Sequence, residues 1–181
     1  MEENNQSVNI EQLHTDIKNT IRAMYTSTSV PTVDFYSRVN SKVIAPAIFF
    51  ELTNVTGVGT STTDQLDCVF RFSAYCIYPY NAPNAILSAR ILACSLASKI
   101  NGNRFGHTMG ASQVTLIEPA EFDAENQQYE TMRVEWEQTG LLGASVFDPD
   151  GSITPTEIYM GIAPDTGIEN ISKYFKVYPI E

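Results

Sequence analysis

An α+β fold, with two helices packed against one antiparallel sheet of about four to five strands, is what the order of apolar patterns predicts. Three- and four-residue spacing marks two helical segments, while alternation and dense apolar runs mark strands. The strands come in adjacent pairs instead of alternating one by one with helices, which is typical of α+β folds. With 181 residues, the chain is long enough for one domain with a substantial core. We expect this domain over residues 1–140 and a C-terminal loop and strand extension over 141–181.

The two helical segments differ in how their apolar residues are distributed. The first begins after Asn9, a favoured N-cap residue, and has one apolar stripe. The stripe consists of Ile10, Leu13, Ile17, Ile21 and Met24. The second helix covers residues 84–100, with Asn81 or Asn84 as its cap and a stop at 101–103. Apolar residues surround it almost completely, which predicts packing on more than one side.

Four segments have the patterns of strands: residues 43–55, 67–78, 112–118 and 127–137. Glycines and hydroxyl residues over 56–66 predict a flexible hairpin connection between the first two strands. A long loop is expected over 139–157, where Gly, Ser, Thr, Pro and Asp are frequent. Two apolar patches, 158–162 and 174–178, indicate further strands or an arm after the core.

Composition and charge exclude several classes of protein. Hydrophobic residues make up 43% of the chain and charged residues 18%, which disfavours disorder. No apolar run reaches the length needed to span a membrane. The net charge of −10, with only 11 basic residues, argues against binding nucleic acid by phosphate neutralisation. No signal peptide is visible, and three cysteines without a CxxC motif favour a reduced, intracellular protein.

Motifs for catalysis or cofactor binding are not found, and we expect no enzyme activity, cofactor or metal site. His107 stands alone in a glycine-rich turn, and no Cys/His group has zinc spacing. The three cysteines lie on apolar faces and are expected in the core. Residues 148–151 resemble the start of an EF-hand but have the glycine at the wrong position, so a turn is expected. An acidic cluster consists of Glu118, Glu121, Asp123 and Glu125, which is typical of a solvated loop.

Two arginines lie in the middle of predicted strands, on the less apolar faces. Arg71 and Arg133 have Glu51, Glu135 and Glu137 as candidate partners. One interpretation is ion pairing that stabilises the sheet internally; the other is pairing across a subunit boundary. The sequence leaves both open.

The arrangement resembles the tail-terminator, or tail-completion, proteins of tailed bacteriophages, particularly contractile Mu-like phages. The resemblance covers residues 10–140: the first helix, the strand PAIFFEL, the hairpin strand LDCVFRFSAYCIY, the helix NAILSARILACSLASKI and the strand YETMRVEWEQTG. The short string RVEWEQ, residues 133–138, also supports it. Residues beyond 140 are not matched.

This resemblance implies a structural virion protein without catalytic residues. Such proteins form a six-fold ring that caps the tail tube, ends its polymerisation and joins the tail to the head–neck connector, with DNA passing through. The implied partners are further copies of the chain, the tail tube, the connector and, as a further candidate, the sheath. The implied location is the tail and neck of the virion, after assembly in the host cytoplasm.

Specific residues are expected in the ring. We expect Glu121, Asp123 and Glu125 to contribute to the channel lining, because like charge keeps DNA from adhering. The C-terminal patches are expected to augment the sheet edge of a neighbouring subunit. The expected subunit interface consists of Arg71, Arg133, Glu135, Tyr159, Ile162, Tyr174, Phe175 and Tyr178.

Two other functions remain open from the sequence. One is another neck or baseplate component, such as a head–tail adaptor, which would differ in symmetry or in its position on the tail. The other is a small-molecule binding module or small enzyme that uses His107, which would require a deep apolar pocket near this residue.

Overall fold

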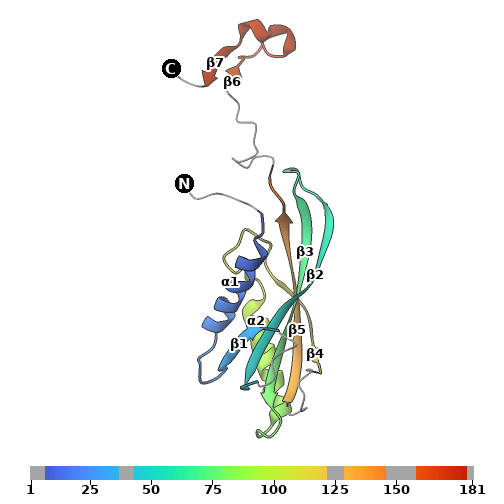
Figure 1. The fold of residues 1–181 in the computed structure, drawn as a ribbon. Coiled ribbons are helices and arrows are strands. Elements are labelled where there is room, and N and C mark those ends of the chain that lie inside the picture. Colours follow the sequence, from blue (N-terminus) through green and yellow to red (C-terminus); the bar gives the residue numbers. More distant parts are fainter. Residues whose placement is uncertain (1–6, 37–42, 122–128, 146–157, 179–181) are drawn as a thin grey trace. The chain divides into compact units, whose positions relative to one another are not determined.

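The fold divides into two compact units (Figure 1). A sheet unit comprises Met1–Ser145 and a C-terminal unit comprises Val146–Glu181. The structure is a computed structural model that describes residues 7–36, 43–121, 129–145 and 158–178. The turn expected at residues 148–151 lies outside this part of the chain. None of the described helices is long and apolar enough to cross a membrane.

A five-stranded sheet with the order β1-β2-β3-β5-β4 forms the centre of the sheet unit. Its strands are β1 (Thr32–Phe35), β2 (Ala47–Thr60), β3 (Leu66–Pro79), β4 (Gln113–Pro119) and β5 (Tyr129–Leu142). Three of the four pairings are antiparallel, which confirms the predicted α+β class. The expectation of a wholly antiparallel sheet needs one correction, because β1 pairs parallel with β2. The four residues of β1 are too few to show a recognisable alternation in the sequence.

The central strands are longer than the sequence predicts. β2 continues to Thr60, so half of the expected hairpin connection is strand and the turn is confined to residues 61–65. β5 likewise continues to Leu142, into the expected loop. Glycine and hydroxyl residues have a low strand preference of their own. Pairing with the continuous strand β3, which has partners on both sides, overrides that preference here.

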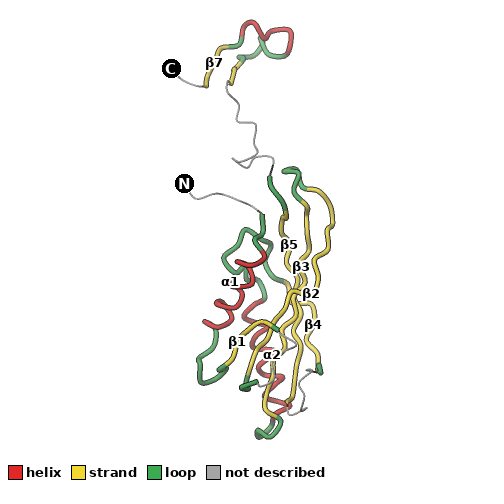
Figure 2. Tube along the Cα trace, in the orientation of Figure 1, coloured by secondary structure: helices red, strands yellow, loops and turns green. Residues whose placement is uncertain are grey.

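Both predicted helices form, and both pack on the same face of the sheet (Figure 2). α1 (Ile10–Ala23) begins at Asn9, whose side-chain Oδ1 accepts a hydrogen bond from the Gln12 amide at 3.0 Å. Three residues of its apolar stripe are fully buried: Leu13, Ile17 and Ile21. α2 (Ala85–Ile100) follows Asn84, but Asn84 has a left-handed backbone and forms no side-chain cap bond. In the core below the helices, Phe72 stacks on Trp136 with ring centroids 5.1 Å apart.

The outer face of α2 is exposed, which corrects the expectation that this helix packs on more than one side. Ala89, Ala93 and Leu96 are buried against the sheet. On the outer face, Ile86, Leu87 and Ile91 are 54%, 55% and 60% exposed. Cys94 is exposed as well, so the prediction of three core cysteines is confirmed for Cys68 and Cys76 and wrong for Cys94. A single sheet offers only one surface to a helix, and the opposite side of α2 is covered by no described element.

The opposite face of the sheet has a smaller apolar cluster near the start of β2. It is formed by Val43, Ala47, Phe49 and Ile77, with the rings of three tyrosines at its border. Beyond this cluster the face becomes polar. The same strand β2 therefore contributes to the core on both faces at its beginning and to neither core at its end.

The C-terminal unit contains two short antiparallel strands and a 3₁₀ helix. β6 (Ile158–Met160) pairs with β7 (Phe175–Tyr178), and η1 (Ile168–Lys173) lies between them. The Tyr174 ring packs so closely over Gly161 that a Cβ atom there would lie 2.4 Å from it, so a larger residue would displace the ring. No described residue of this unit is buried. The contact pattern separates the units after Ser145, a few residues beyond the end of β5.

Candidate functional site: the polar sheet face and the free edge of β2

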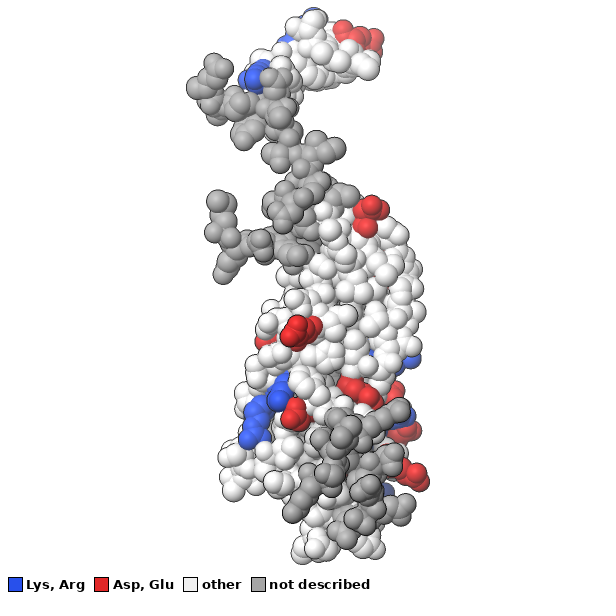
Figure 3. Space-filling model, viewed as in Figure 1, with Lys and Arg blue, Asp and Glu red and all other residues white. Residues whose placement is uncertain are grey.

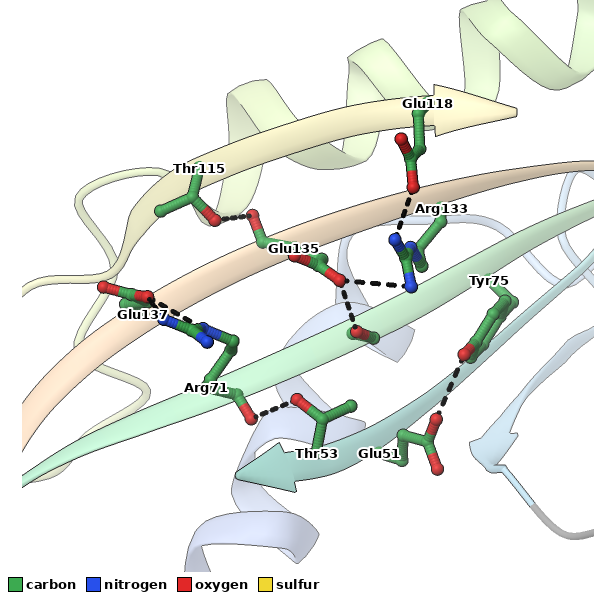
Figure 4. Close-up of polar contacts among 10 residues, drawn as sticks. Glu51, Thr53, Arg71, Tyr75, Thr115, Glu118, Arg133, Glu135 and Glu137 are labelled. Atoms are coloured by element: carbon green, nitrogen blue, oxygen red, sulfur yellow. Dashed lines mark hydrogen bonds and ion pairs between the residues drawn. The ribbon is translucent and has the colours of Figure 1, made fainter. Parts of the chain in front are cut away.

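A ladder of ion pairs and hydrogen bonds crosses the polar face of the sheet, opposite the helices (Figure 4). Arg71 on β3 lies directly across from Glu137 on β5 and donates to its Oε1 from Nε at 2.8 Å. A second bond to the same oxygen comes from Arg71 Nη2. The alternation of β3 places Arg71 on this face because its neighbours Phe70 and Phe72 occupy the buried one.

Arg133 is the centre of the ladder, because it contacts carboxylates on two strands. It pairs with Glu118 on β4 and, at 3.3 Å from Nη1 to Oε1, with Glu135 on its own strand. Ser73 donates to the same Glu135 oxygen at 3.4 Å. Desolvation by burial works to lower the pKa of Arg133, but the Glu118 hydrogen bond and the nearby carboxylate charges outweigh it and raise the pKa.

The ladder ends on β2 at Glu51. Its Oε1 accepts a hydrogen bond from the hydroxyl of Tyr75 on β3 at 3.1 Å. Partial burial and the charge of Glu51 raise the pKa of Tyr75, so the phenol stays protonated well above neutral pH. Three carboxylates on this face contact the two guanidinium groups, and a fourth, Glu51, accepts from Tyr75 instead. The three are Glu118, Glu135 and Glu137.

Both mid-strand arginines are therefore engaged by carboxylates of their own chain. This geometry supplies the internal pairing that the sequence left as one of two interpretations. Arg71 keeps 49% of its side chain exposed. A role for Arg71, Arg133 and Glu135 in a subunit interface stays a prediction.

The second notable feature is the free edge of β2, by which we mean residues 53–60. β1 pairs only with Ala47, Ile48, Phe49 and Phe50, so beyond them β2 has β3 on one side and no described strand on the other. All eight residues of the free edge are exposed. The chain has no charged residue from Leu52 to Thr63, and the surface over the far end of this hairpin is correspondingly white, with an acidic group at its tip (Figure 3).

Free strand edges attract other strands, and proteins usually protect them with charges, proline or bulges. The free edge of β2 has two register shifts, between Leu52 and Asn54 and between Gly57 and Gly59, but neither a charge nor a proline. By contrast, β4 at the opposite edge of the sheet contains Glu118 and ends at Pro119. The edge of β2 is therefore the more open of the two to strand pairing.

The structure places the other predicted site residues as follows. Glu121 is exposed just after β4, while Asp123 and Glu125 lie outside the described residues. Tyr159, Ile162 and Phe175 are exposed in the C-terminal unit at 50%, 67% and 45%. Tyr174 covers Gly161, and Tyr178 is the last residue of β7.

His107 lies in the glycine-rich turn after α2 and contacts α1. Its Nε2 lies 3.0 Å from Asp16 Oδ2 on α1, so it joins the glycine-rich turn to the helix. Two surface grooves, one around Ile86 and one around Val58, do not include His107 in their lining. Among the described residues, no group of three or more His, Cys, Asp and Glu side chains is placed to hold a metal ion.

Sequence reasoning missed the free edge of β2 and the exposed face of α2. A run of twelve residues without charge, 52–63, was a usable signal for the edge, but its glycines indicated a loop. For α2 the signal is the apolar residues on nearly all sides, which predict packing on more than one side but do not show which side is exposed.

Comparisons with known protein families and curated proteins identify no relative of this chain. A scan against protein-family models found no match, and a search of curated proteins found no similar sequence.

Proposed function

We propose that this chain is a structural subunit of a phage tail, a tail terminator whose copies form a ring, most simply of six. In this role the ring caps the tail tube, ends its polymerisation and joins it to the neck, and DNA passes through its centre. The observation that supports the proposal most is the free edge of β2: eight exposed, uncharged residues whose outer backbone groups have no described strand partner.

A ring subunit needs two different surfaces that bind each other, because closed rotational symmetry above two-fold requires head-to-tail contacts. The free edge of β2 provides an acceptor for an additional strand. The C-terminal unit provides a donor, since β6 and β7 form an isolated two-stranded pair whose apolar side chains are exposed. An isolated pair of strands is only marginally stable in water, so association with a neighbouring subunit would stabilise it.

Charge supports the passage of DNA without adhesion. Each chain has a net charge of −10, so six copies would carry about −60 before counterions bind. The ladder face has more carboxylates than guanidinium groups, and Glu121 is exposed at the end of β4. In our proposal Glu121, Asp123 and Glu125 line the channel, and they exclude DNA from the wall instead of binding it.

The free edge can be tested by placing a charge on it. Thr56→Lys puts an ammonium group on the edge, and we expect it to reduce ring formation strongly, because a lysine there would have to lose hydration or repel the incoming strand. Asn19→Lys on the exposed side of α1 is the matched control and should assemble like the unaltered chain. Ring formation would be measured by mass photometry or by electron microscopy in the presence of tail tubes.

The donor is tested by truncation. A chain ending at Gly151 lacks β6 and β7 and should fold to a monomer that does not assemble. An intact ring from this truncated chain would exclude the C-terminal unit as the donor. The function itself is tested by locating the protein in assembled particles by electron microscopy: a ring at the top of the tail is expected, and a position in the baseplate would contradict the terminator role.

A further inference from the structure

The outer face of α2 combines exposed apolar residues with the basic residue Arg90. Ile86, Leu87 and Ile91 are each more than half exposed, and a groove of about 460 Å³ runs beside the first two residues. Arg90 and Glu130 also line this groove. Arg90 forms no ion pair or hydrogen bond with any described residue, although most other cations of the sheet unit have such a partner.

The tip of the β2–β3 hairpin has the complementary character. By hairpin tip we mean residues 58–67. Val58 and Leu66 are 63% and 46% exposed, and they are accompanied by Asp64 and Asp67, the only charged residues between Glu51 and Arg71. Neither aspartate forms an ion pair within the described part of the chain. α2, by comparison, contains Arg90 and Lys99 and no acidic residue.

A single chain cannot bring these two surfaces together. Leu66 and Pro79 are the two ends of β3, and fourteen residues at about 3.3 Å each separate the hairpin tip from the end of the sheet where α2 begins by roughly 40 Å. β3 is paired along its whole length with β5 and along most of it with β2, so it does not fold back on itself. Contact between the two surfaces therefore needs two copies.

We propose that the outer face of α2 binds the hairpin tip of a second copy of this chain. Val58 and Leu66 of one copy pack on Ile86, Leu87 and Ile91 of the next, and Asp64 or Asp67 pairs with Arg90. The contact joins two different surfaces, so it is head-to-tail and builds either a closed ring or an open filament. This contact deepens the proposed function by naming two surfaces through which subunits bind each other. It rests on the part of the proposed function that says copies of the chain associate, and it does not depend on the role in a phage tail.

Charge complementarity favours a second copy as the occupant. Chains with a net charge of −10 repel each other, so self-association requires that the few basic surfaces meet acidic ones. The exposed face of α2 presents Arg90, with Glu130 on the same groove, and the hairpin tip has Asp64 and Asp67 as its only charged residues. The other candidate occupant is the C-terminal unit of a second copy, whose Ile168 is 85% exposed.

Disulfide trapping between two different chains tests the contact directly. One chain carries Val58→Cys together with Cys94→Ser; the other keeps Cys94, which is exposed one turn beyond Ile91 on α2, as its accessible thiol. Cys68 and Cys76 are buried and should react far more slowly than Cys94. After mild oxidation of the mixture we expect a reducible species of double mass, formed about tenfold more than with the control Asn19→Cys/Cys94→Ser.

Two comparisons identify the occupant and the ion pair. If Ile168→Cys/Cys94→Ser cross-links and the Val58 variant does not, the C-terminal unit is the occupant and our inference is wrong; absence of any cross-link above the control also overturns it. Arg90→Asp should lower the Val58 cross-link about tenfold, and adding Asp64→Lys and Asp67→Lys to the other chain should restore it. Failure of this restoration would contradict the proposed ion pair.

The result is independent of where the protein lies in a particle. A cross-link at Val58 combined with a baseplate position would keep this contact and remove the terminator role. A ring at the top of the tail without the cross-link would keep the role and remove this contact.

Discussion

The two halves of β2 show how one strand serves two purposes. Its first four residues, Ala47 to Phe50, are all buried, between β1 and β3 and under apolar clusters on both faces. Its last eight residues are all exposed, although they pair with the same strand β3. Pairing on one side is thus enough to keep the chain in a strand, although with two register shifts, and only partners on the second side and above the faces make it part of a core.

The largest expected difference between the halves is in their sensitivity to lost side-chain volume. Ile48→Ala removes a fully buried side chain and should lower the free energy of unfolding by about 2–5 kcal/mol, because it leaves a cavity under the helices. Val55→Ala, at a position 37% exposed, should cost below ~1 kcal/mol. Urea denaturation of both variants measures the difference, and equal losses would contradict the distinction between the halves.

Thiol labelling should reveal the same difference without altering the sequence. Cys68 pairs with Gly57 in the exposed half, and Cys76 pairs with Ile48 in the buried half. Burial raises the pKa of both thiols and suppresses their reactivity, so each reacts only after local opening. We expect Cys94 to react at once, and Cys68 to react about 10–100-fold faster than Cys76 because the half of the sheet around it opens more easily. Mass spectrometry of peptides would identify the order; faster labelling of Cys76 would show that opening starts at the other end.

Much of the buried half could be predicted from the sequence, and little of the exposed half. Alternating residues such as Phe70 and Phe72 predict β3, and the stripe of Leu13, Ile17 and Ile21 predicts α1. A buried face requires apolar residues at regular intervals, and this spacing is visible in the sequence. The free edge of β2 leaves no such pattern, since its residues face water on both sides and its strand geometry is imposed by β3. The candidate site is of this second kind.

The ion ladder was only half predictable for a related reason. Arg71 and Arg133 could be recognised as polar residues within strands, but their partners depend on the register between strands that are far apart in the sequence. The register places Arg71 opposite Glu137 and Glu118 opposite Arg133. No local pattern encodes such an alignment.

A smaller effect is expected from the ladder itself. Arg133→Met removes the group that neutralises Glu118 and Glu135 and should lower the free energy of unfolding by about 1–2 kcal/mol, a modest value because the pair is partly exposed to water. Arg71→Met, which removes a more exposed arginine from the same face, is the matched comparison and should cost less. A larger loss of stability from Arg71→Met than from Arg133→Met would contradict the central position of Arg133 in the ladder.

The smallest effect is expected beside the buried half of β2, on the neighbouring strand β1. There Asp34, which lies opposite Phe49, pairs with Lys18 of α1 at 2.8 Å. Desolvation works to raise the pKa of Asp34, but the hydrogen bonds from Lys18 and the Phe35 amide outweigh it and lower the pKa. A lowered pKa in the folded state means that the stabilisation is present above the unfolded pKa of this carboxyl, close to 4, and is lost as the pH falls below it. Asp34→Asn should therefore flatten the acid limb of the stability profile by less than about 1 kcal/mol, since the pair is exposed. An unchanged acid limb would show that this pair contributes nothing.

Hydrogen exchange along β2, compared between the isolated chain and the assembled state, tests the central claim most directly. If the free edge is where another copy pairs, the amides of residues 53–60 that face away from β3 should become strongly protected on assembly, while those of Ala47 to Phe50, already protected, should change little. Unchanged exchange over residues 53–60 in a verified assembly would contradict the account, because the edge would then remain open to water in the state for which it was proposed.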